Sequence, residues 1–504
     1  MVIILFIFIL GGLAASYFYL TKNYNYWRNR NIPFAKGILP GFGHVWSLLL
    51  MRITLADLIK QICSGYPNQS MVGFYYQTTP ALVIREPELI KTVLQTNFAS
   101  FSKNLWNVDP HLDRLLRVNP FFTYGDTWLI SRRFFSLAFT SRYLKTYFNC
   151  IEQVCKKLEN FLNDKLRKNN NVIELDLNKL ASSYTTSVAS LISFSVEQNI
   201  SYEHESQSVL FANVAEKVFG PSLYSRIMQS FNFYFYDLKR LLRMSFIPKK
   251  VNHFFSTTVK EIIDIRQQEQ SAHRLDFLQL MLNMKKNKEI EEDLIAAYVF
   301  TLFVNISDTS NVSLSFVVYQ IARHPHVQQK LRDEVKSVLE KYDGRLTYDA
   351  LKEMTYLDQV LKESQRVYST ASCLAKICTE EFELKGSDGL SCRVHPGTII
   401  FINVHEMHKN PKYWPNPDVF DPDRFDKKTK INKYTFLPFG EGQRICVAMR
   451  LALLQSKAYL AVIMKNYTLE VSSKTPKEPF KFLPGRFLTS PVGRLWVHFK
   501  PLSS

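Results

Sequence analysis

A stretch without glycine or proline, from Asp293 to Arg323, most constrains the fold of this chain. It is about thirty residues long, whereas the mean helix of globular proteins has about twelve, so we expect a helix that crosses a large core. His324-Pro325 ends it, because the residue before a proline avoids helical geometry. Helical periodicity prevails from about Asp57 onward, and short β-like runs interrupt it at 71–76, 81–84 and 398–404. These patterns predict a mainly α (α+β) fold, a large helical domain with small β-sheets.

The composition fits a large folded body. Of the 504 residues, 46% are hydrophobic and 14% aromatic, enough for a sizeable core and an apolar pocket. The length alone allows about three domains. However, the candidate functional residues extend from Trp128 to Cys446, and independent domains would separate parts of one site.

The chain is strongly basic, with 63 Lys and Arg against 45 Asp and Glu and a net charge of +18. Such a charge suits nucleic acid, an anionic membrane or an acidic protein partner. No long basic block or recognised nucleic-acid module occurs, so nucleic acid is not an expected partner. Seven cysteines without a Cys-x-x-Cys pair indicate reduced thiols in a cytosol-facing protein.

Residues 1–21 carry no charge and, at about 1.5 Å per residue, would span the roughly 30 Å of a bilayer core. We therefore expect a single N-terminal transmembrane anchor. The first charged residues after it are basic, which by the positive-inside rule places the body in the cytosol: Lys22, Arg28, Arg30 and Lys36. A signal peptide cleaved near Ala14-Ala15-Ser16 is the alternative, although the basic n-region is missing. Residues 22–56 follow as a basic hinge that contains Pro33 and Pro40.

The segment Phe439-Gly-Glu-Gly-Gln-Arg444-Ile-Cys446 places one thiol before the apolar helical run that begins at Val447. Arg444, the backbone N–H groups of the glycine-rich turn and the helix N-terminus would all favour a thiolate. A thiolate is the form of cysteine that binds metals, and a lone activated thiolate suggests haem iron. A buried structural cysteine is the alternative.

The spacing Phe-x-x-Gly-x-Arg-x-Cys resembles the haem-binding loop of cytochromes P450, in which the cysteine is the proximal iron ligand. Three further segments look most like insect microsomal P450s of the xenobiotic-metabolising type: Tyr26-Trp-Arg-Asn-Arg, Arg274-Leu-Asp-Phe-Leu-Gln and Phe436-Leu-Pro-Phe-Gly-Glu-Gly. The resemblance implies the P450 fold, with a haem-thiolate catalytic domain over residues 57–504. It also implies haem b (iron-protoporphyrin IX) as cofactor, with Cys446 as axial ligand and Phe439 and Arg444 in the haem-binding loop.

Further residues acquire roles from the same resemblance. Trp128 and Arg132 look like the family's Trp-x-x-x-Arg pair, which contacts a haem propionate, and their spacing places both side chains on one helix face. Lys376 lies where the family often has another basic propionate contact. The Glu-x-x-Arg pair and the arginine of a Pro-x-Arg-Phe segment would form a buried supporting network: Glu363, Arg366 and Arg424. Without the resemblance, Glu363 and Arg366 would be read as a surface ion pair.

The long helix carries Asp308 and Thr309 at the positions of the acid and the hydroxyl that relay protons during oxygen activation in the family. The two glycine-rich positions before them hold Asn305 and Ile306 instead. Ile306 is bulky and β-branched, and Asn305 places an amide on the face of Thr309. These departures put oxygen activation in question, unless a local shift of the helix accommodates them.

The resemblance implies a haem-thiolate monooxygenase acting on a lipophilic small molecule, such as a xenobiotic or insecticide, a hormone or another endogenous lipid. Residues 229–255 are rich in aromatic and basic residues, which suits a membrane-dipping substrate entrance or, equally, a core helix with a solvated basic face.

The resemblance further implies the endoplasmic reticulum membrane as location and NADPH-cytochrome P450 reductase as electron donor, with cytochrome b5 as a possible second donor. Two other functions stay open: a haem-thiolate isomerase or dehydratase that does not use dioxygen, and a non-catalytic haem- or ligand-binding membrane protein.

Overall fold

The computed structural model describes residues 2–198, 200, 214, 218, 220, 222–235, 241–268 and 274–502. The chain forms two compact units, and each is built from segments distant in sequence. The first unit comprises Met1–Trp106, Ala371–Trp414 and Asn432–Ile445. The second comprises Asn107–Thr370, Pro415–Ile431 and Cys446–Ser504.

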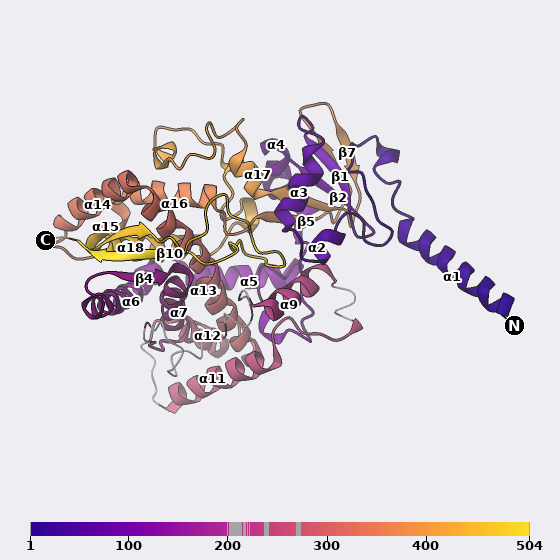
Figure 1. Cartoon of the computed structure of the whole chain (residues 1–504). Helices are drawn as coiled ribbons and strands as arrows, with labels where there is room; N and C mark the ends of the chain where they lie inside the picture. Colours follow the sequence, from indigo (N-terminus) through magenta and orange to yellow (C-terminus); the bar gives the residue numbers. More distant parts are fainter. Residues whose placement is uncertain are drawn as a thin grey trace. The chain divides into compact units, whose positions relative to one another are not determined.

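The first unit contains the N-terminal helix, the larger β-sheet and a few short helices (Figure 1). Its α-helices are α1 (Val2–Thr21), α2 (Trp46–Leu49), α3 (Leu55–Ser64), α4 (Pro87–Lys91) and α17 (Val404–Lys409). Its strands are β1 (Met71–Tyr76), β2 (Thr79–Ile84), β3 (Lys103–Asn104), β5 (Cys373–Ile377), β6 (Phe382–Lys385), β7 (Ser391–Val394) and β8 (Ile399–Asn403). Helix α1 is long and apolar enough to cross a membrane, and its apolar side chains are exposed.

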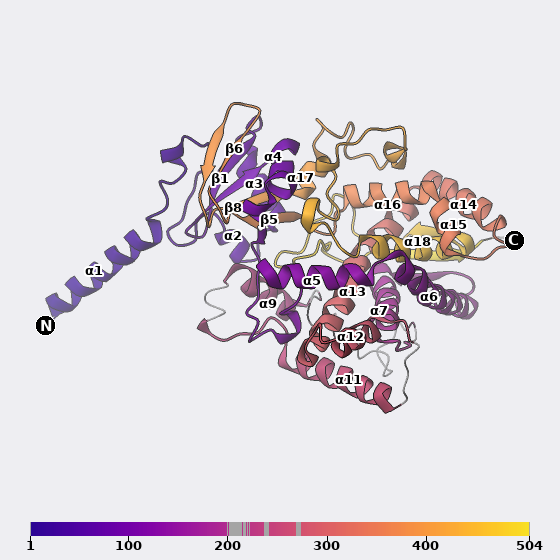
Figure 2. The ribbon, with the colours of Figure 1, turned by 180° about the vertical axis from the view of Figure 1, so that it is seen from behind.

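Five strands of the first unit form one sheet in the order β1-β2-β8-β5-β3, seen from behind in Figure 2. Strands β2 and β8 run parallel, with Leu82 opposite Ile400, while the other neighbours pair antiparallel. Strand β8 is buried along its whole length, as expected of an apolar strand inside a sheet. The remaining strands of this unit, β6 and β7, form a separate hairpin.

The predicted hinge packs against this sheet. Trp27 is fully buried, and its indole Nε1 donates a hydrogen bond to the Phe74 carbonyl at 2.7 Å. Gly73 makes this possible, because a Cβ there would lie 2.6 Å from the Trp27 ring. The chain after the anchor is therefore held by β1 rather than left as an open linker.

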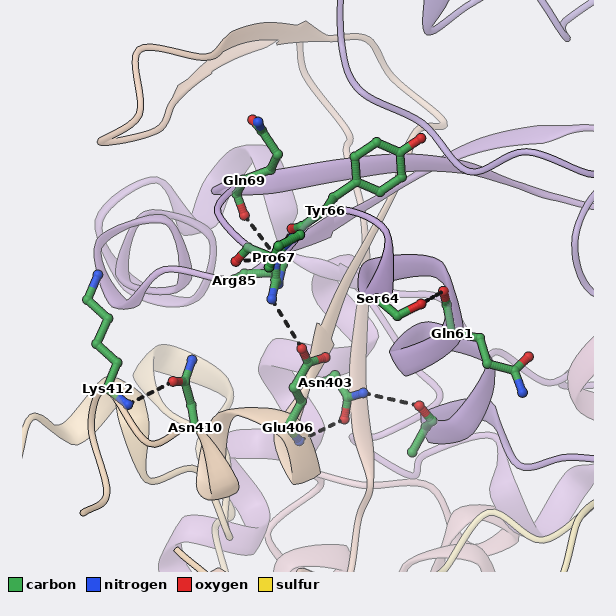
Figure 3. A network of polar contacts seen from close by, with 11 residues as sticks. Gln61, Ser64, Tyr66, Pro67, Gln69, Arg85, Asn403, Glu406, Asn410 and Lys412 are labelled. Carbon is green, nitrogen blue, oxygen red and sulfur yellow. Dashed lines mark hydrogen bonds and ion pairs between the residues drawn. The ribbon is translucent and has the colours of Figure 1, made fainter. Parts of the chain in front are cut away.

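A second polar joint ties the sheet of the first unit to its helices (Figure 3). Arg85, at the end of β2, donates to the Tyr66 carbonyl at 2.5 Å and to Glu406 of α17 at 3.3 Å. Asn403 caps α17 through the Glu406 N–H and also donates to the Ala56 carbonyl of α3. Because most of these partners are backbone groups with fixed positions, the joint is structural.

The second unit is mainly helical. Its α-helices are α5 (Gly125–Ala138), α6 (Ser141–Lys168), α7 (Leu177–Phe194), α9 (Leu223–Tyr234), α11 (Lys249–Gln268), α12 (Phe277–Lys286), α13 (Glu292–Arg323), α14 (Pro325–Glu340), α15 (Tyr348–Glu353), α16 (Thr355–Val367) and α18 (Met449–Asn466). Its small antiparallel sheet has the order β4-β10-β9, with β4 (Ile173–Asp176), β9 (Tyr467–Val471) and β10 (Trp496–Pro501).

Helix α13 confirms the predicted long helix, and it begins one residue earlier than Asp293. It packs along α7 and also contacts α11, α12, α16 and α18, so helices surround it through the second unit (Figure 1). Most of its residues are buried all round, as expected of a helix inside a large core. Helix α13 therefore has few accessible positions, and Asn305 and Thr309 are two of them.

Candidate functional site

The glycine-rich segment before Cys446 is a tight turn of the first unit, with a short 3-10 helix over Gly442–Arg444. Gly442 has a φ of 78°, and a Cβ on it would lie 1.9 Å from the Leu94 carbonyl oxygen. Only glycine fits this position, because both the backbone conformation and the close approach exclude a side chain. The local backbone therefore explains why the Phe-x-x-Gly-x-Arg-x-Cys pattern has a glycine at position 442.

The same turn is held by side chains of the first unit. Lys433 donates to Glu441 at 3.1 Å and to Gln95 at 3.0 Å, and Tyr434 donates to the same Gln95 oxygen at 2.5 Å. Glu441 in turn accepts from the Gly442 N–H. These hydrogen bonds hold the conformation of the turn.

Two cations lie near one another in the first unit. Lys376 is buried, at 5% exposure, and donates to the neutral amide oxygen of Asn104 at 2.7 Å. Burial, and secondly the charge of Arg444, lower the pKa of Lys376 to about 7. Burial and the second cation make the charged form of Lys376 unfavourable unless an anion is bound beside it. Lys376 and Arg444 therefore fit a carboxylate such as a haem propionate.

Cys446 opens the last segment of the second unit, three residues before α18. Its side chain has accessible surface, yet surrounding protein desolvates the thiol and raises its pKa. The Ala448 backbone N–H and the positive charge of Arg132 act in the opposite direction and favour the thiolate. The donor set is therefore one accessible sulfur with a nearby cation, which fits a single axial bond to haem iron.

Trp128 and Arg132 both lie on α5, one helical turn apart. Trp128 is buried at 7% exposure, and Arg132 is half-buried, with its pKa lowered by burial and raised by the neighbouring Cys446 thiol. The structure thus brings Arg132 and Cys446 into electrostatic range although 314 positions (446 − 132) separate them in the chain.

The four candidate residues on α13 differ in their surroundings. Asn305 and Thr309 are exposed on one face, and the Thr309 hydroxyl donates to the Asn305 carbonyl at 2.7 Å. Ile306 is only 3% exposed, so its bulk contributes to the packing of the helix. Of the two departures from the family pattern, Asn305 is therefore accessible and Ile306 is not. The helix continues without a break through both positions.

Asp308 is the titratable group of this face. Its Oδ2 atom is buried and has no hydrogen-bond partner among the described residues. Burial raises the pKa of Asp308 to about 7, and the positive charge of Arg486 opposes part of this rise. A carboxyl with such a pKa can hold or release a proton near neutral pH. Sequence reasoning missed Arg486, because no motif surrounds it and only the tertiary fold places it near Asp308.

Glu363, Arg366 and Arg424 come together in the second unit. Glu363 and Arg366 on α16 have fully buried side chains, joined by two hydrogen bonds of 2.7 and 2.8 Å. The Nε atom of Arg424 lies 3.4 Å from Glu363, and the same carboxylate accepts from the Asp421 N–H at 2.9 Å. Arg366 also donates to the Val419 carbonyl. The spacing that would ordinarily give a surface ion pair thus gives a buried network here.

Comparisons with known proteins agree with these features. The family model for Cytochrome P450 matches residues 40–497. The chain is 30% identical to Cytochrome P450 6B7 of Helicoverpa armigera, over 97% of this chain and 96% of that protein. It is 31% identical to Probable cytochrome P450 6a13 of Drosophila melanogaster, over 97% and 96%, and 28% identical to Cytochrome P450 6a2 of the same species, over 99% of each.

The predicted fold class and the predicted haem cofactor are confirmed by these matches. The family model covers most of the chain that follows the N-terminal anchor, including the loop around Cys446. The chain belongs to the cytochrome P450 family and is a haem-dependent monooxygenase.

Proposed function

We propose that this P450 inserts one oxygen atom from O2 into a lipophilic small molecule, with Cys446 as the axial haem ligand. The accessible Cys446 thiol, with the cation of Arg132 beside it, is the observation that supports the proposal most strongly. A bound haem supplies the dioxygen and one-electron chemistry that side chains lack. By the family resemblance, the candidate propionate contacts are Trp128, Arg132, Lys376 and Arg444, and Phe439 would belong to the haem-binding loop.

Asp308 and Thr309 would supply and move the protons. Asp308 holds a proton at its buried carboxyl near neutral pH, and Thr309 has an accessible hydroxyl one position further along α13. To pass a proton, the Thr309 hydroxyl has to turn away from the Asn305 carbonyl that it contacts. General acid-base catalysis of this kind contributes about 10²–10⁴ in rate.

The raised pKa of Asp308 predicts a pH dependence. Its folded-state pKa of about 7 lies above the ordinary aspartate value, so the carboxyl is protonated below about pH 7 and ionises above it. We expect coupled product formation to fall as pH rises through 7. Asp308→Asn should lower it by about 100-fold and flatten the pH profile, whereas Asp308→Glu should keep a titration. Product formed per NADPH, measured between pH 6 and 8, checks this; identical profiles for the wild type and Asp308→Asn would contradict it.

The same shift has a consequence for stability. The favourable contribution of Asp308 is fully present below the unfolded-state pKa and is lost as pH rises through the folded-state pKa of about 7. Asp308→Asn should therefore gain unfolding free energy relative to the wild type above pH 7. Denaturant unfolding at two pH values gives a readout independent of turnover.

A lipophilic substrate is supported by the second unit. The outer face of α9 exposes Leu223, Tyr224 and Ile227, and Leu241 and Leu242 are exposed further along the chain. Exposed apolar side chains of this kind favour contact with lipid. Most of the predicted entrance segment, 229–255, is described, but its residues 236–240 lie outside the described part.

We further propose that α1 anchors the protein in the endoplasmic reticulum membrane with its body in the cytosol. The exposed apolar surface of α1 and the basic residues that follow it support this orientation. NADPH-cytochrome P450 reductase would then deliver electrons, with cytochrome b5 as a second donor. The basic character of the chain suits a partner with an acidic surface.

Turnover by the full-length chain in membranes tests this proposal. Together with purified reductase, NADPH and oxygen, the protein should oxidise a lipophilic test compound, and ¹⁸O2 should label the product with one atom. Omission of reductase or of NADPH should abolish the product. Unlabelled product, or turnover of a peroxide without reductase as the sole activity, would refute the proposed reaction.

A further inference from the structure

A side-chain hydrogen bond joins α18 to α13 inside the second unit. The Nε2 atom of Gln455, on α18, donates to the hydroxyl of Ser310, on α13, at 2.6 Å. Both side chains are withdrawn from water, since Gln455 is 0% and Ser310 is 4% exposed. The two helices are in contact and lie side by side in Figures 1 and 2. Because no solvent competes for either partner, this bond fixes the distance between the helices at one point.

Each end of the bond lies close in sequence to a proposed part of the reaction machinery. Ser310 directly follows Asp308 and Thr309, the proposed proton-carrying pair. Gln455 lies nine residues after Cys446 (455 − 446), the proposed axial ligand, and both residues belong to the second unit. The hydrogen bond therefore connects the helix that carries the proton donors with the helix that follows the thiol.

The backbone of Gln455 is held by a third helix. The Tyr184 hydroxyl, on α7, donates to the Gln455 carbonyl at 3.0 Å, and the Cys155 thiol of α6 lies 3.7 Å from the same hydroxyl. The Tyr184 ring also packs on that of Tyr459, one turn further along α18, with 4.7 Å between the ring centroids. Because α7 packs along α13 as well, the position of Gln455 is set with respect to both helices.

Stability alone does not account for a glutamine at this position. The Oε1 atom of Gln455 is buried and has no hydrogen-bond partner among the described residues. A buried acceptor without a partner is destabilising, because folding removes it from water without a replacement. Methionine would fill a similar volume without this disadvantage. The residue that binds Ser310 is therefore not the most stable choice, which is typical of functional positions.

We propose that Gln455 is a positioning residue, which acts through Ser310 to fix the proton-carrying turn of α13 relative to α18. The inference rests on the proposed function and concerns the fraction of turnovers that give product. Proton transfer is sensitive to displacements of about 0.5 Å, because donor and acceptor have to lie within hydrogen-bond reach. Without the link, dioxygen would more often take up two electrons from NADPH and two protons, and leave as hydrogen peroxide while the substrate stays unoxidised.

Substitutions at both ends of the bond test this role in the full-length protein, with reductase, NADPH and methyl dodecanoate as substrate. Gln455→Met and Ser310→Ala should each lower product formed per NADPH at least threefold and raise hydrogen peroxide correspondingly, with an unchanged KM. The double variant should be no worse than either single variant, because the two residues act as one link. Ser310→Thr, which keeps the hydroxyl, should retain most of the wild-type yield.

Two measurements that do not depend on turnover separate positioning from packing. The denaturant midpoint of Gln455→Met should equal or exceed that of the wild type, since the buried acceptor is removed. Hydrogen exchange of the backbone amides at 305–315, relative to those of α7, should become at least threefold faster, because α13 loses a fixed contact there.

Gln328→Met is the matched control. Gln328 is likewise buried, and its amide joins α14 to β9 of the same unit through two hydrogen bonds with the Leu469 backbone, at 3.0 and 2.9 Å. Its replacement leaves those backbone groups without their partner, so the unfolding midpoint should fall. Product formed per NADPH should stay unchanged, which is the opposite of the effects expected at Gln455.

Unchanged coupling and exchange in Gln455→Met would overturn the inference. A loss of coupling that occurs only together with a lower unfolding midpoint would also overturn it, because packing alone would then explain the effect. If the wild type consumed no NADPH beyond the rate of reductase alone, while Gln455→Met still accelerated exchange at 305–315, the link would be supported and the proposed function refuted.

Discussion

Cys446→Ser should abolish the thiolate-type Soret band of the reduced carbon monoxide complex, and with it monooxygenase turnover. Serine preserves the size of the side chain but replaces a thiol, which can bind a metal as the thiolate, by a hydroxyl that stays protonated. The Ala448 N–H and the charge of Arg132, which favour an anion at this position, cannot compensate for that difference. The absorption spectrum of the full-length protein in membranes measures the effect directly.

Cys150→Ser is the matched control for this substitution. Cys150 is half-buried on α6, and burial raises the pKa of its thiol to about 11, so it is unsuited to act as a thiolate. Its replacement should leave the Soret band unchanged. A thiolate-type band that survives in Cys446→Ser would show that the iron ligand is another residue.

Arg366→Met should leave little folded protein. The Glu363 and Arg366 side chains are fully buried, and the substitution strands a carboxylate that accepts two hydrogen bonds from Arg366. Breaking a buried pair from one side costs about 3–5 kcal/mol, a large part of the roughly 5–15 kcal/mol that stabilises most domains. The yield of haem-loaded protein and its denaturant unfolding midpoint measure the loss.

A second ion pair of the same spacing provides the control. Asp349 and Lys352 on α15 also lie three residues apart, but their side chains are 65% and 59% exposed. Lys352→Met should change the unfolding free energy by less than about 1 kcal/mol, because exposed pairs contribute little. The double variant Glu363→Leu/Arg366→Met should recover part of the stability lost in Arg366→Met. Equal effects of Lys352→Met and Arg366→Met would contradict the role of burial.

Several elements could be predicted because their signals are local. The absence of glycine and proline marked α13 almost to the residue, and an uncharged apolar run marked α1. The short apolar and aromatic run at 71–76 marked β1 over its observed bounds. Strand β3 has only two residues, too few for such a signal, and its pairing partner β5 is distant in sequence.

The division into two units was also beyond local patterns. The chain alternates between them, so no single boundary in the sequence separates the two units. Trp27, which is buried against β1, shows why: whether a proline-containing segment is a free hinge depends on the surface that it contacts. That surface is formed by residues more than forty positions away.

The sequence by itself indicated a candidate haem-binding loop through the spacing from Phe439 to Cys446, and the structure shows why Gly442 of that loop excludes a side chain. Such a motif is readable because its parts are adjacent in the chain. Only the tertiary structure decided that Ile306 packs inward while Asn305 stays accessible, and that Arg486 acts on Asp308. Burial and electrostatic interaction depend on which distant segments fold together, and for that reason no spacing in the chain reveals them.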